Sequence, residues 1–129
     1  MIEISYGTPE NLVIATAHGK VTAEDYERTL IPAVEAKLKA HKKVRMLYHL
    51  DRDLSGFTAG AIWDDAKLGI HHLTAFEAVA LVTDIHWVTD ATNFFAFFIR
   101  CPVKVFKNDQ LAEAMEWVST VHWMTLKGD

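Results

Sequence analysis

The alternation of short apolar runs with longer segments of helical periodicity is the feature that most constrains the fold. Runs rich in β-branched and aromatic residues predict strands, and they lie at 2–6, 12–17, 44–50, 76–82 and 103–106. Helices are predicted at about 23–40, 59–71 and 85–99, and from 108 or 109 onward. The order β-β-α-β-α-β-α-β-α predicts an α/β sandwich with a mixed, mostly parallel sheet that begins with a hairpin.

Local signals define the ends and inner faces of these helices. Thr22 is the expected N-cap of the first helix, with Asp25 as the capping-box carboxylate. Pro32 should bend that helix or loosen one turn. Thr58 and Asp84 are the expected caps of the second and third helices. The inner face of the first helix is predicted to be Tyr26, Leu30, Val34 and Leu38, that of the second Ala59, Ile62, Ala66 and Ile70, and that of the last Leu111, Ala114, Met115, Val118 and His122.

Composition and charge argue against several classes of protein. Half of the 129 residues are hydrophobic and 23% are charged, which is typical of one globular domain spanning 1–129. The net charge of -4 argues against a nucleic-acid partner, which requires a concentrated basic surface. The single cysteine, Cys101, cannot form an internal disulfide, and the sequence contains neither a signal-peptide pattern nor an uncharged apolar run of about 18 residues. We therefore expect a cytoplasmic protein.

The segment 85–99 is the most aromatic part of the chain, and Asp90 is its only formal charge. Its candidate ligand-binding residues are Trp87, Ala91, Phe94, Phe95, Phe97 and Phe98. In one interpretation the aromatic stripe belongs to the core, and Phe97, on the polar side, is an ordinary exposed residue or a dimer contact. In the other, the helix is a lid whose rings line a pocket for an apolar small molecule or lipid, or enter a membrane interface.

Basic residues gather at the predicted turn between the first helix and the strand at 44–50. They are Lys37, Lys39, Lys42, Lys43 and Arg45. Such a patch would attract anionic lipid headgroups by about 1 kcal/mol per charge near a membrane surface. Alternatively, it is a solvated turn that stabilises the C-terminal end of the helix.

No pattern of catalytic or metal-binding residues stands out. The sequence contains no zinc-protease, Cys-x-x-Cys, G-x-S-x-G, phosphate-loop or dinucleotide-binding motif. Asp51, Asp53, Asp64 and Asp65 could surround a cation at the end of a strand, where open α/β sheets often bind ligands. A solvated acidic surface is the more common arrangement. We therefore predict no catalytic residues, no metal site and no cofactor.

Three segments, DYERTLIPAVEAKLKAHKKVRMLYHLD, FTAGAIWDDAKLGIHH and FEAVALVTDIHWV, together resemble the SpoIIAA-like branch of the STAS domains over nearly the whole chain. This resemblance implies the STAS sandwich fold and a bacterial regulatory or binding role. Regulatory STAS domains carry a phosphorylated serine just before a glycine that aligns with Gly60, but alanine occupies that position here. Thr58 is the remaining candidate for phosphorylation, and its alternative role is that of helix cap.

The SpoIIAA-like branch is also similar in fold to CRAL-TRIO lipid carriers, which implies a ligand- or membrane-associated role. Two functional hypotheses follow. The first is a non-enzymatic protein that binds an apolar small molecule or lipid under a movable aromatic helix at 85–99, with peripheral contact to a membrane. The second is a STAS-type protein-interaction module that uses the loop at 51–58 and the second helix. A homodimer is compatible with both hypotheses.

Overall fold

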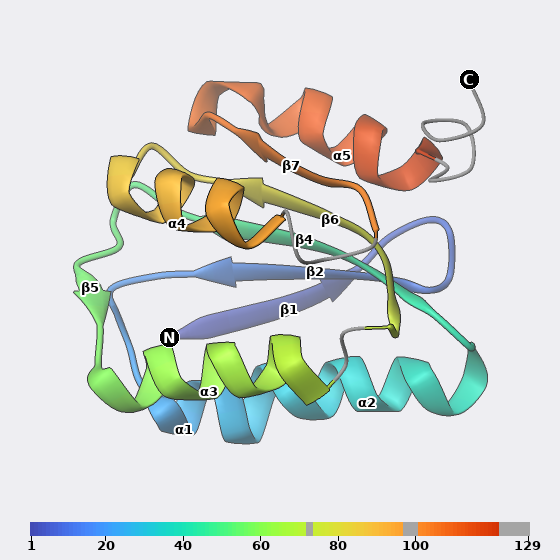
Figure 1. The fold of residues 1–129 in the computed structure, drawn as a ribbon, viewed down its shortest axis with the longest axis horizontal. Helices are drawn as coiled ribbons and strands as arrows, with labels where there is room; N and C mark the ends of the chain where they lie inside the picture. Colours follow the sequence, from blue (N-terminus) through green and yellow to red (C-terminus); the bar gives the residue numbers. More distant parts are fainter. Residues whose placement is uncertain (72–73, 97–100, 122–129) are drawn as a thin grey trace.

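The central sheet has five strands in the order β1-β2-β4-β6-β7. The computed structural model describes residues 1–71, 74–96 and 101–121, with the side chains of 69–71 and 94–96 left out (Figure 1). The strands are β1 (Ile2–Tyr6), β2 (Leu12–Ala17), β4 (Val44–Leu50), β6 (Phe76–Val82) and β7 (Val103–Phe106). β1 pairs antiparallel with β2, and the other pairs are parallel. The predicted hairpin and mostly parallel sheet are confirmed.

Helices cover both faces of this sheet. One face carries α1 (Ala23–Asp25), the π-helical turn η1 (Tyr26–Leu30), α2 (Ile31–Ala40), α3 (Ala59–His71) and α4 (His86–Ala96). The other face carries α5 (Leu111–Thr120), which follows the short 3₁₀ turn η2 (Asn108–Gln110). Right-handed crossovers between successive parallel strands place their helices on one face. A small second sheet, β3 (Lys20–Val21) paired with β5 (Gly56–Phe57), lies beside the main one.

The first helical segment forms as its local signals predict. The Thr22 hydroxyl accepts from the backbone N–H of Asp25, whose carboxylate accepts from the backbone N–H of Thr22. The π-helical turn comes just before Pro32, which lacks a backbone N–H and disfavours the regular α-helical hydrogen bonding of the preceding turn. The expected loosened turn is therefore confirmed. Tyr26, Leu30 and Val34 are fully buried.

The inner face of α3 differs from the prediction. Ala59, Ile62 and Ala66 are exposed, and the side chain of Ile70 lies outside the described residues. The buried positions are Ala61, Asp64 and Leu68. Packing against α1 decides this rotation, because a Cβ atom on Gly60 would lie only 3.0 Å from Cβ of Ala23. The helix therefore turns its small residues toward α1 and an apolar stripe toward solvent.

A chain of hydrogen bonds links α3 to the core. The Tyr26 hydroxyl donates to Oδ1 of Asp65 at 2.8 Å, so it accepts the 2.8 Å hydrogen bond that it shares with the Tyr48 hydroxyl. Both tyrosines are buried. Although Asp65 as a residue is exposed, its Oδ1 reaches inward, and desolvation of the carboxyl group raises its pKa, against the Tyr26 hydrogen bond, which lowers it.

Replacement of Asp65 by asparagine should change how stability depends on pH. Because the pKa of Asp65 is raised above its ordinary 3.8, the native protein binds more protons than the unfolded chain just above that pH, and stability falls as pH rises through this window. Asparagine carries no such penalty and its amide oxygen still accepts from Tyr26. We expect Asp65→Asn to be more stable than wild type at pH 7, with the advantage shrinking toward pH 4.

Urea denaturation of both proteins at several pH values checks this expectation. Asp25 and Asp84, whose pKa values are lowered by hydrogen bonds from Thr22 and Asn108, contribute in both proteins and cancel in the difference. An advantage of the variant that grows as pH falls would contradict the assignment.

Candidate functional site

The carboxyl edge of the parallel strands gathers most of the polar side chains that could act together. β2, β4, β6 and β7 all end at this edge, on the left of Figure 1. The residues that follow these strands include His18 after β2, Asp51 after β4, Asp84 after β6 and Asn108 after β7. Open α/β sheets bind ligands at such an edge. A ligand site is therefore expected at this edge.

Asn108 is the centre of one network at this edge. Its Nδ2 donates to the carbonyl oxygen of Leu50 at 3.2 Å, and its Oδ1 lies 2.6 Å from Nε2 of His49. Its backbone N–H donates to Oδ1 of Asp84 at 3.0 Å, and Oδ2 of Asp84 lies 3.7 Å from Nε of Arg52. The hydrogen bond from Asn108 holds the pKa of Asp84 below its ordinary value. The predicted role of Asp84 as a cap of α4 is wrong, because its carboxylate turns toward Asn108 and Arg52.

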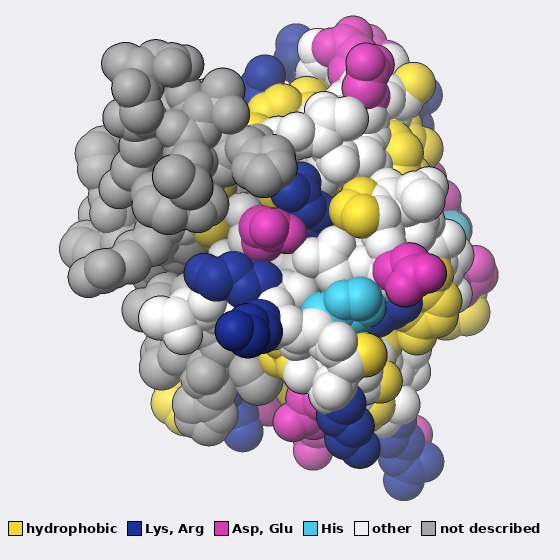
Figure 2. Space-filling view, turned by 90° about the vertical axis from the view of Figure 1, so that its right-hand side faces the viewer, with side chains coloured by type: hydrophobic (Ala, Val, Ile, Leu, Met, Phe, Trp, Pro, Cys, Tyr) yellow, Lys and Arg dark blue, Asp and Glu magenta, His cyan; other side chains and the backbone are white. Residues whose placement is uncertain are grey.

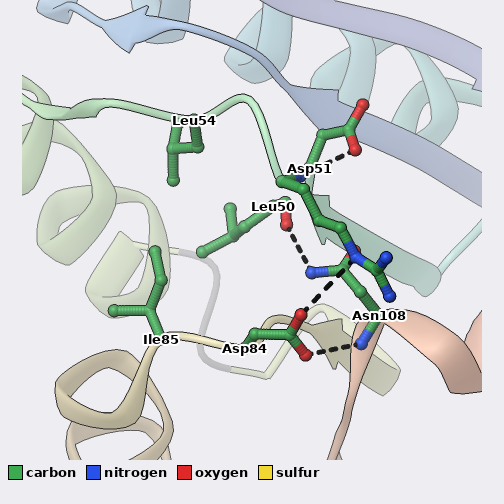
Figure 3. A pocket seen from close by; sticks show the side chains of 7 residues that line it. Leu50, Asp51, Leu54, Asp84, Ile85 and Asn108 are labelled. Carbon is green, nitrogen blue, oxygen red and sulfur yellow. Dashed lines mark hydrogen bonds and ion pairs between the residues drawn. The ribbon is translucent and has the colours of Figure 1, made fainter.

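A small cavity lies beside this network (Figure 3). Its volume is about 180 Å³, and it is lined by Leu50, Asp51, Arg52, Leu54, Asp84, Ile85 and Asn108. Drug-sized ligand pockets usually hold about 300–1,000 Å³. The cavity is therefore large enough for a few water molecules or a very small ligand, and it lies before the start of α4 rather than beneath that helix.

A second cluster at the same edge is centred on His18. Nδ1 of His18 lies 3.1 Å from both carboxylate oxygens of Asp53 and 3.2 Å from Oδ2 of Asp51. Oε1 of Glu3 lies 3.7 Å from its Nε2. Asp51 and Asp53 were expected from the sequence to lie at a strand end, whereas His18 was not expected there. Asp64 and Asp65, which were predicted to join them, belong to α3 and contact Lys67 and Tyr26 instead.

The predicted aromatic residues of α4 are only partly described. Trp87 is 58% exposed, and its ring contacts the ring of Phe57 edge to face at 6.4 Å between centroids. Val88, one position along, packs against the core, and Ala91 is half-buried. The side chains of Phe94, Phe95, Phe97 and Phe98 lie outside the described residues. The inward side of the first turn of α4 is thus the Val88 side, and the large ring of Trp87 faces solvent.

Arg45, one of the five residues of the predicted basic patch, is buried and does not belong to the surface. Arg45 is only 5% exposed, because its Nε donates to Oε2 of Glu77 at 2.9 Å and its Nη1 donates to the carbonyl oxygen of Val118 at 2.8 Å. Arg45 therefore fastens α5 to the sheet and cannot meet a membrane surface. Lys39, Lys42 and Lys43 are exposed, whereas Lys37 is half-buried with its Nζ 4.6 Å from the ring centroid of Tyr6.

The edge where α2 ends does not present one continuous basic surface. Figure 2 faces this side of the molecule, and its visible Lys and Arg side chains lie in small groups, with acidic, histidine and other side chains between the groups. Among the described residues, no helix combines the length and the apolar character needed to cross a bilayer.

Burial raises the pKa of the Cys101 thiol to about 11, so this group stays protonated at neutral pH.

Thr58 acts as the helix cap, one of its two predicted roles. Its hydroxyl accepts from the backbone N–H of Ala61 at 3.1 Å, and its own N–H donates to the carbonyl oxygen of Val21.

The outer surface of α3 carries residues that were predicted to face the core. Ile62 is 52% exposed and Trp63 is 65% exposed. Ala59 and Ala66, one turn before and after, are exposed as well. Positions 59, 62, 63 and 66 follow the i, i+3, i+4, i+7 spacing of one helix face. The helix therefore presents an apolar stripe to solvent at the end of the 51–58 loop.

Comparison with known proteins finds a matching family and a solved structure with a similar fold. A family model described as SpoIIAA-like matches residues 12–119. The crystal structure of an uncharacterised DUF3478-family protein with a SpoIIAA-like fold from Shewanella loihica PV-4 matches with a TM-score of 0.72 and 29% sequence identity, over 92% of each chain. No match was found among curated proteins.

Proposed function

Because the chain belongs to the SpoIIAA-like family, we propose that it is a non-enzymatic protein-interaction module that binds through the outer face of α3. The observation that carries this proposal is the exposure of Ile62 and Trp63, at 52% and 65%, on one helix face. Tryptophan is enriched among the residues that dominate binding energy at protein interfaces. An apolar helix face turned to water is typical of a surface that a partner covers.

The occupant that we propose first is a second copy of the chain. The stripe alternates small and large residues, with Ala59 and Ala66 on either side of Ile62 and Trp63. In a twofold interface the same surface meets itself, so large side chains of one copy can pack over the small ones of the other. The pattern therefore suits self-association through α3, and the same surface can serve other apolar protein partners.

Replacement of Trp63 by serine should weaken the dimer by at least about tenfold, because truncation of a tryptophan hot spot typically costs about 2 kcal/mol or more and about 1.4 kcal/mol corresponds to tenfold. Sedimentation velocity over a concentration series measures the dissociation constant. Tyr6→Ser is the matched control, because Tyr6 is a similarly exposed aromatic residue, at 55%, on β1 rather than on α3. A wild-type chain that stays monomeric at all concentrations, or a dimer that survives Trp63→Ser, would refute the proposal.

An apolar small molecule or lipid bound beneath α4 is the second candidate. The exposed Trp87 and the apolar members Leu50, Leu54 and Ile85 of the nearby cavity favour it. Since the cavity is only about 180 Å³ and lies before the start of α4, such a ligand requires α4 to move away from the sheet. Native mass spectrometry for co-purified lipid and sedimentation with phosphatidylcholine–phosphatidylglycerol vesicles test it. Binding that Trp87→Ala abolishes supports this candidate, and no lipid together with no vesicle binding removes it.

A further inference from the structure

We propose that His18, Asp51 and Asp53 form a binding site for a divalent cation of the zinc class. The three side chains come from two segments that follow adjacent parallel strands, β2 and β4. One ligand atom from each lies within 4.8 Å of the others. This site is distinct from the α3 surface and does not depend on it.

The distances within the cluster suit a shared cation. Nδ1 of His18 lies 3.1 Å from Oδ1 and Oδ2 of Asp53 and 3.2 Å from Oδ2 of Asp51. Zinc binds imidazole nitrogen and carboxylate oxygen at about 2.0–2.2 Å, so neighbouring ligand atoms around it are separated by about 3 Å or slightly more. Only small movements of these side chains are needed to close around an ion.

The number of oxygens exceeds what the histidine alone can satisfy. A ring nitrogen carries at most one proton and donates one good hydrogen bond, yet three carboxylate oxygens from two residues converge on Nδ1. Oε1 of Glu3 faces the other ring nitrogen at 3.7 Å. Together Asp51, Asp53 and Glu3 place three carboxylates around the ring, and a divalent cation compensates their charge better than one proton does.

The backbone holds two of the three ligands in place. Ala17 pairs with Leu50 in the β2–β4 register, which brings the next residues, His18 and Asp51, side by side. The backbone N–H of Asp51 donates to the carbonyl oxygen of Ala17, and that of Ser55 donates to the carbonyl oxygen of Gly19. Gly19 has a φ of +55°, a conformation that glycine adopts without strain, so the chain can turn directly after His18.

The carboxylate of Asp51 is also held by a hydrogen bond to the oxygen that does not face His18. Oδ1 of Asp51 accepts from the backbone N–H of Arg52 at 2.7 Å, which leaves Oδ2 directed at His18. Hydrogen bonds of this kind orient metal ligands in proteins. Asp53 is exposed, and Asp51 also lines the small cavity. Water can therefore complete the coordination, as in zinc sites with an open position.

Isothermal titration of the full chain with zinc chloride tests the site. We expect one ion per chain at this cluster, and a loss of affinity above about tenfold in both His18→Gln and Asp53→Asn, since even outer partners of a metal ligand contribute that much. His86→Gln is the matched control, because His86 is an exposed histidine on α4, four residues before Asp90, and lies outside the cluster. It should leave the affinity unchanged.

Two further measurements distinguish a variant that folds poorly from one that folds but lacks a metal-binding side chain. Circular dichroism without metal should give similar melting temperatures for wild type and Asp53→Asn, whereas zinc should raise that of wild type only. Cobalt substituted for zinc should show no thiolate charge-transfer band, because the cluster contains no cysteine. Zinc binding that persists in His18→Gln, a cobalt–thiolate band, or no binding by wild type at neutral pH would overturn the proposal.

Discussion

Glu77→Ala should lower the free energy of unfolding by about 3 kcal/mol, because it leaves the charge of Arg45 inside the protein without its carboxylate. Nε of Arg45 donates to Oε2 of Glu77 at 2.9 Å, and Nδ2 of Asn11 donates to the same oxygen at 3.0 Å. The Arg45 side chain is 6% exposed and that of Glu77 is 27% exposed. Partial exposure of Glu77 puts the loss at the low end of the range for buried pairs. Urea denaturation at pH 7 measures it.

Two control variants separate the buried pair from a generic charge effect. Arg28→Ala removes the exposed i,i+4 pair with Glu24 and should cost no more than about 0.5 kcal/mol. The double variant Arg45→Met, Glu77→Ala should be more stable than Glu77→Ala alone, because no unpaired charge remains. A single-variant loss as small as that of Arg28→Ala would show that water reaches Arg45.

The strand order and most helix ends follow from local signals that act within a few residues. Thr22 and Thr58 cap helices as their chemistry predicts, because a side-chain hydroxyl reaches N–H groups only three residues away. β6 is buried on both faces, as its nearly uncharged sequence indicates, with Leu81 in one core and Ala80 in the other. These features depend little on distant parts of the chain.

The rotation of α3 shows where periodicity fails. The stripe at 59, 62 and 66 is the more apolar face, so the sequence favours burying it, yet the opposite side carries the contacts. Gly60 packs closely on Ala23, and Asp65 reaches Tyr26, and both partners lie more than 30 residues earlier in the chain. Similarly, Arg45 appears in the sequence as one of five neighbouring basic residues, and only its contacts with Glu77 and Val118 show that it is buried.

Only some residues of the candidate site at the carboxyl edge could be predicted from the sequence. Asp51 and Asp53 were visible as acids after a strand, because they are close in sequence. His18 was missed, since its proximity depends on the register that pairs Ala17 with Leu50. The signal that could have found it is the combination of a parallel β2–β4 pair with a histidine directly after the first strand.

Tyr26→Phe should lower the free energy of unfolding by about 2–3 kcal/mol, because one buried hydroxyl serves two partners, the buried Tyr48 and the inward oxygen of Asp65. It donates to Oδ1 of Asp65 and accepts from the Tyr48 hydroxyl, each at 2.8 Å. Its removal leaves one donor and one acceptor unsatisfied, at a cost of about 1–3 kcal/mol each before relaxation. Tyr48→Phe removes only one of these hydrogen bonds and keeps the one between Tyr26 and Asp65, so its loss should be about half as large.

Tyr6→Phe is the matched control for both variants, because the Tyr6 ring is 55% exposed and the contact of its face with Nζ of Lys37 does not involve the hydroxyl. Its effect should stay within about 0.5 kcal/mol, as for most surface substitutions. The expected order of losses is therefore Tyr26→Phe, then Tyr48→Phe, then Tyr6→Phe. Equal losses for the two buried tyrosines would mean that each contributes one independent hydrogen bond. The chain of hydrogen bonds from Tyr48 on β4 through Tyr26 to Asp65 on α3 would then not act as one unit that keeps the apolar stripe facing solvent.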